Sequence, residues 1–185
     1  YDADRPETAV SVHDYLARTF GKLDILVNNA GIAREELMTN NSSTVTQEVL
    51  EQTFQTNLFA VIALTQTLLP LIRKSPAGRI VNLSSILGSL TLHSMAESPI
   101  APAKAFAYNA SKTALNAYTV HLANELASTN IKVNSAHPGW VKTELGGEHA
   151  PMEVVDSNRT SLYLATLAAD GPNGGFFHEK DALPW

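Results

Sequence analysis

Short apolar runs alternate along this chain with stretches that carry apolar residues at helical spacing, and this alternation constrains the fold more than any other feature. Four runs are predicted to be strands: residues 23–27, 79–83, 131–136 and 175–178. The stretches around them are predicted to be helices: residues 4–20, 46–72, 108–127 and 154–169. Strands that alternate with helices favour an α/β fold, in which right-handed crossovers connect the strands of a parallel sheet.

Composition narrows the class of protein. The 185 residues, of which 44% are hydrophobic, predict one domain that spans residues 1–185. A net charge of −5, with no basic cluster longer than Arg73-Lys74, argues against nucleic acid and anionic membranes as partners. The absence of cysteine excludes disulfides and thiolate nucleophiles, and the six histidines lack metal-ligand spacing. We therefore expect no metal site.

The most apolar stretch covers residues 58–72 and bears on the location of the protein. It is interrupted by polar residues such as Thr65 and Gln66 and by Pro70, and it is too short to cross a bilayer. We also see no signal peptide. The sequence therefore favours a cytoplasmic protein.

Tyr108 and Lys112 stand four residues apart at the start of a predicted helix. Residues at this spacing lie on the same helical face, so the ammonium is expected to lie beside the phenol and to lower its pKa. Such a phenol could donate or accept a proton in carbonyl or alcohol chemistry. The pair alone is also explained by a half-exposed tyrosine with a lysine packed along it.

Several further motifs accompany this pair in a fixed order. They are Asn28-Asn29-Ala30-Gly31 after the first predicted strand, then Asn57, Ser84-Ser85 and Pro138-Gly139-Trp140-Val141-Lys142-Thr143. The ordered set resembles the short-chain dehydrogenase/reductase family. The final stretch, residues 171–185, is similar to the carbonyl reductase branch. The resemblance implies a Rossmann-type doubly wound parallel sheet in three α/β/α layers.

The resemblance implies a catalytic set of four residues. Tyr108 would be the general acid in reduction, and Lys112 would lower its pKa and bind the nicotinamide ribose. Ser85, the second serine of its pair, would hydrogen-bond the substrate oxygen. Asn57 would anchor a water molecule that returns the proton. Taken singly, Ser85 also fits a turn serine, and Asn57 a buried asparagine bonded to backbone.

The resemblance also implies a nicotinamide dinucleotide, with NADPH favoured over NADH because the carbonyl reductase branch usually prefers it. The choice stays open, because the residue that reads the ribose 2′ position follows a strand that this sequence lacks. The implied cofactor-binding residues, besides Tyr108 and Lys112, are Asp2, Ala3, Asn28, Asn29, Ala30, Gly31, Pro138, Gly139, Val141 and Thr143.

Apolar residues that flank the catalytic motifs are candidates for a substrate pocket, because small-molecule sites are mostly apolar. Core packing or a subunit contact is the alternative for each of them. The five candidates are Leu87, Leu90, Met95, Trp140 and Leu145.

The family's opening strand and its Gly-x-x-x-Gly-x-Gly turn, which bind the cofactor pyrophosphate, have no counterpart in these residues. The N-terminal strands of the fold are therefore expected to be missing from this sequence. Asp2-Ala3 would then match the residues that border the adenine. A strand at residues 23–27 would have one unpaired edge. We expect either residues upstream of Tyr1 or a stabilising partner.

Two functions remain open at this point. The first is an NAD(P)-dependent reductase of a ketone, aldehyde or quinone. The second is a catalytically silent binding or scaffold protein, favoured by the missing phosphate loop and opposed by the complete catalytic set. A homodimer, homotetramer or monomer all fit, and the sequence names neither the substrate nor the physiological direction.

Overall fold

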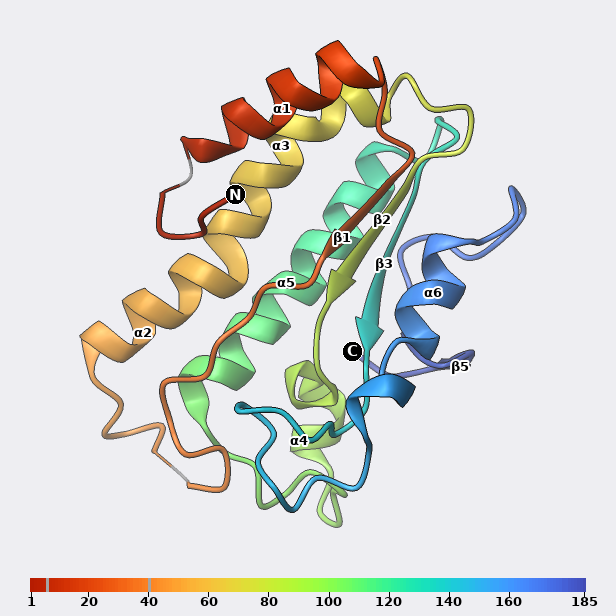
Figure 1. Ribbon diagram of the computed structural model, residues 1–185. Helices are drawn as coiled ribbons and strands as arrows, with labels where there is room; N and C mark the ends of the chain where they lie inside the picture. Colours follow the sequence, from red (N-terminus) through yellow and green to blue (C-terminus); the bar gives the residue numbers. More distant parts are fainter. Residues whose placement is uncertain (6, 40) are drawn as a thin grey trace.

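The computed structural model describes the whole chain except Pro6 and Asn40. Its centre is a five-stranded sheet in the order β1-β2-β3-β4-β5 (Figure 1). The first four strands run parallel, and the last turns back antiparallel to its neighbour. The strands are β1 (Ile25–Asn28), β2 (Arg79–Leu83), β3 (Lys132–His137), β4 (Phe176–His178) and β5 (Asp181–Ala182).

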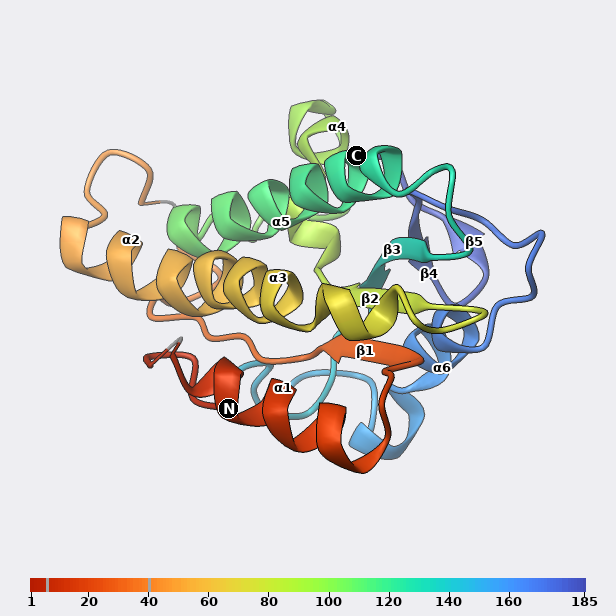
Figure 2. The same ribbon diagram turned by 90° about the horizontal axis from the view of Figure 1, so that it is seen from above.

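Helices cover both faces of this sheet. The helices are α1 (Thr8–Thr19), α2 (Gln47–Phe54), α3 (Ala60–Ile72), α4 (Leu90–Ser94), α5 (Phe106–Glu125) and α6 (Arg159–Ala165). Helices α3 and α5 lie over one face and α6 over the other, while α1 packs along α3 (Figures 1 and 2). The predicted α/β/α layering is therefore confirmed, with β5 as an antiparallel addition that the sequence did not reveal.

Successive side chains of β2 pack on opposite faces of the sheet and thereby belong to two separate parts of the core. Ile80 belongs to the cluster that packs under α3 and α5, together with Leu26 of β1 and Val133 of β3. Val81, the next residue, packs on the opposite face against Leu164 of α6. Successive side chains of a strand point to opposite faces, so a fully buried parallel strand is apolar on both.

The helix that follows β1 has nearly the predicted extent but is less regular than expected. Thr46 caps it by accepting a hydrogen bond from the backbone N–H of Val49. A π-helical segment, η1 (Gln55–Phe59), joins α2 to α3. Pro70 lies in the last turn of α3, and the helix continues through it to Ile72. A proline in the last turn of a helix disrupts little of the hydrogen-bond ladder that follows it.

The continuous helix from Gln47 to Ile72 has 26 residues and is long and apolar enough, by length and composition, to cross a membrane. This corrects the expectation based on residues 58–72 alone. Within the protein, 44% of its most apolar window is buried, and Leu68 and Ile72 belong to the core under the sheet. Packing in this core is sufficient to explain its apolar residues.

Strand β1 forms one edge of the sheet, as predicted, and pairs only with β2 among the described strands. Leu26 and Asn28 point toward α3 and are buried. Ile25 and Val27 point the other way and are 43% and 40% exposed. The face of β1 opposite α3 is therefore only partly covered by the described residues.

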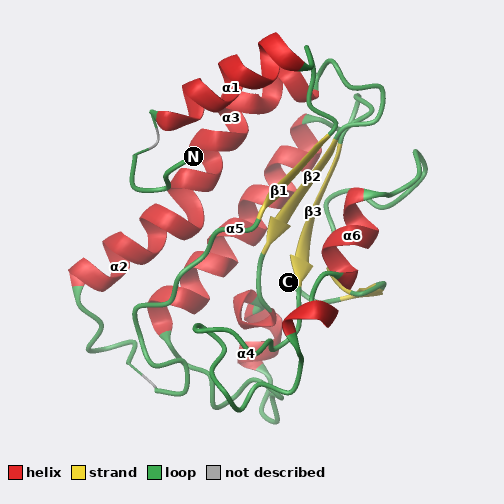
Figure 3. Cartoon of the chain, in the orientation of Figure 1, coloured by secondary structure: helices red, strands yellow, loops and turns green. Residues whose placement is uncertain are grey.

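Two predicted helices differ in detail. The helix predicted over residues 4–20 begins only at Thr8, without a side-chain cap, and Phe20, which follows it, is 62% exposed. Residues 86–106 contain a 3₁₀ turn, η2 (Ile86–Gly88), and α4. Residues 154–169 hold a 3₁₀ turn, η3 (Val154–Asp156), followed by α6. The described residues between β1 and α2 form loops and turns (Figure 3).

Candidate active site

Tyr108 and Lys112 lie on the face of α5 that packs toward the carboxyl end of β2. Both side chains are buried, with exposed fractions of 7% and 3%. The Lys112 ammonium lies 5.7 Å from the centroid of the Tyr108 ring. It donates a hydrogen bond of 2.7 Å to the carbonyl oxygen of Leu83, the last residue of β2. The helix therefore brings the two groups together as the spacing predicted.

Burial, more than mutual attraction, controls the ionisation of this pair. It raises the pKa of the Tyr108 phenol, and a hydrogen bond with Ser85 offsets part of that rise. Burial also lowers the pKa of the Lys112 ammonium to about 8. The phenol pKa of the protein alone is therefore raised, and the lowering expected from Lys112 stays a prediction. A phenol with a raised pKa keeps its proton near neutral pH, which suits a proton donor.

Ser85 is the second residue after β2, and its hydroxyl is close enough to the Tyr108 phenol to influence the phenol pKa. The Ser85 hydroxyl accepts a hydrogen bond from the backbone N–H of Leu87 at 3.2 Å, which caps the turn η2. Ser84 instead donates to the Lys112 carbonyl oxygen at 3.4 Å. The turn packs tightly on α5, because a Cβ at Gly88 would lie 2.8 Å from the Lys112 carbonyl carbon. This arrangement supports Ser85 over Ser84 as the serine beside the reacting group.

Asn57 lies in the π-helical segment and is fully buried. Its side-chain oxygen accepts from the backbone N–H of Ile32 at 2.8 Å, and its amide donates to the Ile32 carbonyl oxygen and to Ser111. The side chain therefore clamps the segment that follows the Asn28-Asn29-Ala30-Gly31 motif. The water-anchoring role predicted for Asn57 stays a prediction, because these contacts engage both ends of its amide.

Gly31 brings that motif into the same site. A Cβ at this position would lie 3.2 Å from the Lys112 Nζ and 3.6 Å from the Asn57 Oδ1. Glycine thus leaves space open directly over the ammonium. Within the described residues, Lys112 uses only one of its three N–H donors, on Leu83. A buried ammonium with spare donors and open space beside it fits a ligand rich in hydroxyl groups.

Asn28 has a different position from the rest of its motif. It is buried, and its amide donates to Thr65 of α3 and to Asn82 of β2. Asn82 in turn donates to Thr119 of α5. Asn28 therefore ties β1 to the sheet and to α3, whereas Asn29, Ala30 and Gly31 are exposed at the end of the strand. The cofactor roles expected for the four residues of this motif stay predictions.

The loop after β3 carries the second predicted cofactor motif. Gly139 has a φ of 98°, a conformation that favours glycine, and Val141 is buried and forms a bridge with Met152. The Thr143 hydroxyl accepts from the Gly146 backbone N–H at 3.0 Å. Pro138 begins the loop at the carboxyl end of the sheet, on the edge where open α/β sheets bind ligands.

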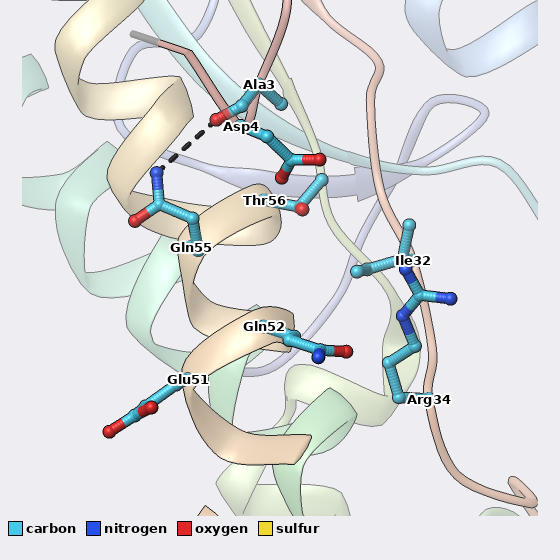
Figure 4. Close-up of a pocket in the computed structure, with 8 residues that line it drawn as sticks. All are labelled: Ala3, Asp4, Ile32, Arg34, Glu51, Gln52, Gln55 and Thr56. Carbon is cyan, nitrogen blue, oxygen red and sulfur yellow. Dashed lines mark hydrogen bonds between the residues drawn. The ribbon is translucent and has the colours of Figure 1, made fainter. Parts of the chain in front are cut away.

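A cavity of about 630 Å³ lies beside the N-terminal residues (Figure 4). Gln55 donates to the carbonyl oxygen of Ala3 and holds the N-terminal segment against the helix. Asp2 is turned away into an ion pair with Arg5 at 2.8 Å. Ala3 therefore lines the cavity and the Asp2 carboxylate does not, and the cofactor roles expected for both residues stay predictions. The lining residues are Ala3, Asp4, Ile32, Arg34, Glu51, Gln52, Gln55 and Thr56.

The five predicted substrate-pocket residues do not line this cavity. Leu87 follows Ser85 in the turn η2 and is half-buried. Trp140 follows Gly139 and donates to the Gly146 carbonyl oxygen. They flank the catalytic groups from two sides but form mostly open surface, since four are exposed: Leu90, Met95, Trp140 and Leu145.

Two functional candidates have no signal in the sequence. Glu35 and Asn41 lie in the loop between β1 and α2, and their side chains bind the first backbone N–H groups of α5. Neither belongs to a motif, and the helix they cap starts more than 60 positions later. Contacts over such a separation depend on the fold and not on local pattern.

Comparison with known proteins decides the family. The family model described as short chain dehydrogenase matches residues 1–154. The chain belongs to the short-chain dehydrogenase family. Carbonyl reductase [NADPH] 1 of Mus musculus is 30% identical over 221 residues, which cover 100% of this chain and 78% of the relative. Short-chain dehydrogenase/reductase 1 of Saponaria officinalis is 30% identical, with 76% of its length covered.

Solved structures of short-chain dehydrogenases have the same fold. The carbonyl reductase Sniffer of D. melanogaster superposes with a TM-score of 0.84 at 32% identity, over 100% of this chain and 76% of that chain. The NADPH-bound carbonyl reductase from chicken fatty liver gives 0.85 at 26% identity, over 100% and 75%. The family and branch indicated by the motifs are thereby confirmed for this short-chain dehydrogenase.

Proposed function

We propose that this protein is an NADPH-dependent reductase of ketone, aldehyde or quinone carbonyls, in which Tyr108 donates the proton. The observation that carries the proposal is the meeting of the Tyr108 phenol, the Ser85 hydroxyl and the Lys112 ammonium at the carboxyl end of β2. The relatives named as NADPH carbonyl reductases support the same reaction class.

The residues present fit the adenosine, ribose and amide parts of a nicotinamide dinucleotide, whereas the turn that binds the pyrophosphate has no counterpart among them. When bound, such a cofactor supplies a hydride to the carbonyl carbon. Lys112 would bind its ribose hydroxyls through spare N–H donors, with Gly31 leaving room beside the ammonium. Ala3 and Ile32 would border the adenosine at the cavity, while Pro138, Gly139, Val141 and Thr143 would hold the amide end. NADPH is preferred over NADH on the strength of the relatives' names.

Each catalytic group has one task in this reaction. Ser85 would donate to the carbonyl oxygen as negative charge develops there, and Tyr108 would transfer its proton to the same oxygen. The proton stays on Tyr108 until it is needed, because burial raises the pKa of the phenol. Lys112 would then stabilise the phenolate left behind, from its position 5.7 Å from the ring centroid.

The test is the oxidation of NADPH and NADH by the protein against a panel of quinones, aldehydes and ketones. Tyr108→Phe should abolish turnover, because it removes the proton donor and keeps the ring that fills the site. Tyr118→Phe is the matched control, since Tyr118 lies on the same helix and packs in the core under the sheet. Substantial turnover by Tyr108→Phe would refute the assigned acid, and a folded protein inactive on every carbonyl would refute the reductase.

A further inference from the structure

The first turn of α5, which carries Tyr108, is capped by side chains from a distant loop. Ala105 precedes the helix and provides no side-chain cap. Instead, the Asn41 Oδ1 accepts from the backbone N–H of Phe106 at 2.9 Å. The two carboxylate oxygens of Glu35 accept from the N–H groups of Ala107 at 3.2 Å and Tyr108 at 2.9 Å. Three successive donors that a helix start leaves without partners are thus satisfied.

The capping pair is held together internally. The Asn41 amide donates to Glu35 Oε1, the same oxygen that binds the Ala107 N–H. A carboxylate that binds two adjacent N–H groups places negative charge at the positive end of the helix dipole. Glu35 is therefore bound on both sides and reaches the backbone of Tyr108 itself.

The same short segment is also fixed on its other side. Asn57 binds both the N–H and the carbonyl of Ile32. Three residues further on, Glu35 binds the Tyr108 N–H. The segment 32–35 therefore connects the clamp next to Gly31 with the backbone of the proposed proton donor.

We propose that Glu35, held by Asn41, is a positioning residue that fixes the first turn of α5 and thereby the Tyr108 phenol relative to Ser85 and Lys112. This inference rests on the proposed function for the role of Tyr108. The third residue of a helix lies where fraying is greatest, so an uncapped Tyr108 backbone would move. Small displacements of a reacting group cost much of the rate, since a misplacement of about 1 Å can reduce turnover by about 100-fold.

The experiment compares Glu35→Ala, Glu35→Gln and Glu36→Ala in NADPH-dependent carbonyl reduction. Glu36 is the matched control, because it is exposed in the same loop and its side chain contacts only Thr39 among the described hydrogen bonds. Glu35→Ala should lower kcat by roughly 10- to 100-fold and leave the KM for NADPH unchanged. Glu35→Gln keeps one acceptor oxygen and should restore part of kcat. Glu36→Ala should match the wild type.

A second readout needs no turnover. Amide hydrogen exchange at Ala107 and Tyr108 should accelerate in Glu35→Ala and stay unchanged in Glu36→Ala. If the wild type reduces no carbonyl, the proposed function fails, and this exchange still decides whether Glu35 fixes the turn.

Several outcomes would overturn the inference. One is a kcat for Glu35→Ala equal to that of the wild type. Another is a fall in thermal stability with kcat and amide exchange unchanged, which would make Glu35 a stabilising residue only. If Glu35→Ala does not fold, Glu35→Gln takes its place, and a wild-type kcat in that variant would contradict the proposal.

Discussion

The ammonium of Lys112 lies 5.7 Å from the ring centroid of Tyr108 and donates a hydrogen bond to the Leu83 carbonyl oxygen at 2.7 Å. Burial favours the neutral form of both groups, so it raises the pKa of Tyr108 and lowers the pKa of Lys112 to about 8. Near neutral pH the phenol therefore holds its proton while the lysine is still mostly charged. This combination suits a proton donor whose conjugate base must be stabilised.

Replacing Lys112 by methionine should lower kcat for carbonyl reduction by about 100-fold or more, because the phenolate that forms at Tyr108 loses its neighbouring cation. The apparent affinity for NADPH should also fall, since the proposed ribose donor is lost. Steady-state kinetics measure both effects. Lys74→Met, at an exposed lysine outside the site, should behave as the wild type. An unchanged kcat in Lys112→Met would exclude a catalytic role for the ammonium.

The depressed pKa of Lys112 also predicts how stability depends on pH. The folded-state pKa of about 8 lies below the unfolded value of about 10.4. Between these pH values the unfolded chain holds a proton that the folded protein has released, so the free energy of unfolding rises with pH by up to about 1.4 kcal/mol per unit. Above pH 10 the raised pKa of Tyr108 acts in the opposite direction.

Denaturant unfolding of the cofactor-free protein between about pH 7 and pH 9.5 tests this dependence. The wild type should gain stability relative to Lys112→Met as the pH rises through 8. Subtracting the variant removes the contributions of all other titrating groups. A constant difference across this range would show that the lysine pKa is not depressed in the folded protein.

Alanine substitutions at the two serines after β2 should have very different effects on kcat. Ser85→Ala removes the hydroxyl that bonds the Tyr108 phenol and should lower kcat by about 100- to 1,000-fold, the usual effect of losing one donor to a developing oxyanion. Ser84→Ala removes a long bond of 3.4 Å to the Lys112 carbonyl oxygen and should keep most of the activity. Equal losses of kcat in the two variants, measured with the same carbonyl, would contradict the assignment of Ser85 rather than Ser84 as the catalytic serine.

Local pattern was sufficient for most of the fold. Residues 79–83 were predicted as a strand and are β2, because a fully buried parallel strand is apolar on both faces and stands out between polar turns. The ordered motifs likewise predicted that Ser85, Tyr108 and Lys112 lie in one site. These residues meet because the topology of a parallel sheet places the ends of adjacent elements at one edge.

Features that depend on tertiary contacts could not be predicted. The π-helical segment around Asn57 forms where its side chain binds Ile32, 25 positions earlier. The cap of α5 comes from Glu35, which has no motif and no fixed spacing to Tyr108. The pKa of Tyr108 rises although the spacing to Lys112 suggested the reverse, because burial has the largest effect on the phenol.

Asn57→Ala should weaken the binding of NADPH as well as the fold. The substitution leaves the N–H and carbonyl of the half-buried Ile32 without their partner, which costs at most about 1–3 kcal/mol for each group. The freed segment next to Gly31 should then raise the Kd for NADPH in a fluorescence titration. Asn116→Ala is the control, because the Asn116 side chain is buried without a hydrogen bond among the described residues. Reduced stability with an unchanged Kd would make Asn57 a structural residue only.

Gly31→Ala should affect NADPH binding and turnover, through the space beside the Lys112 ammonium, without destabilising the fold. The added Cβ would lie 3.2 Å from the Lys112 Nζ, the end of a flexible side chain, so the lysine can move at little cost and the melting temperature should change little. Displacement of the ammonium and occupation of the adjoining space should instead raise the KM for NADPH and lower kcat. A melting curve and steady-state kinetics on the same sample measure both. Wild-type kinetics with a displaced lysine would show that neither this space nor the position of Lys112 matters for the reaction, and would redirect the search for the ribose site to the cavity beside Ala3.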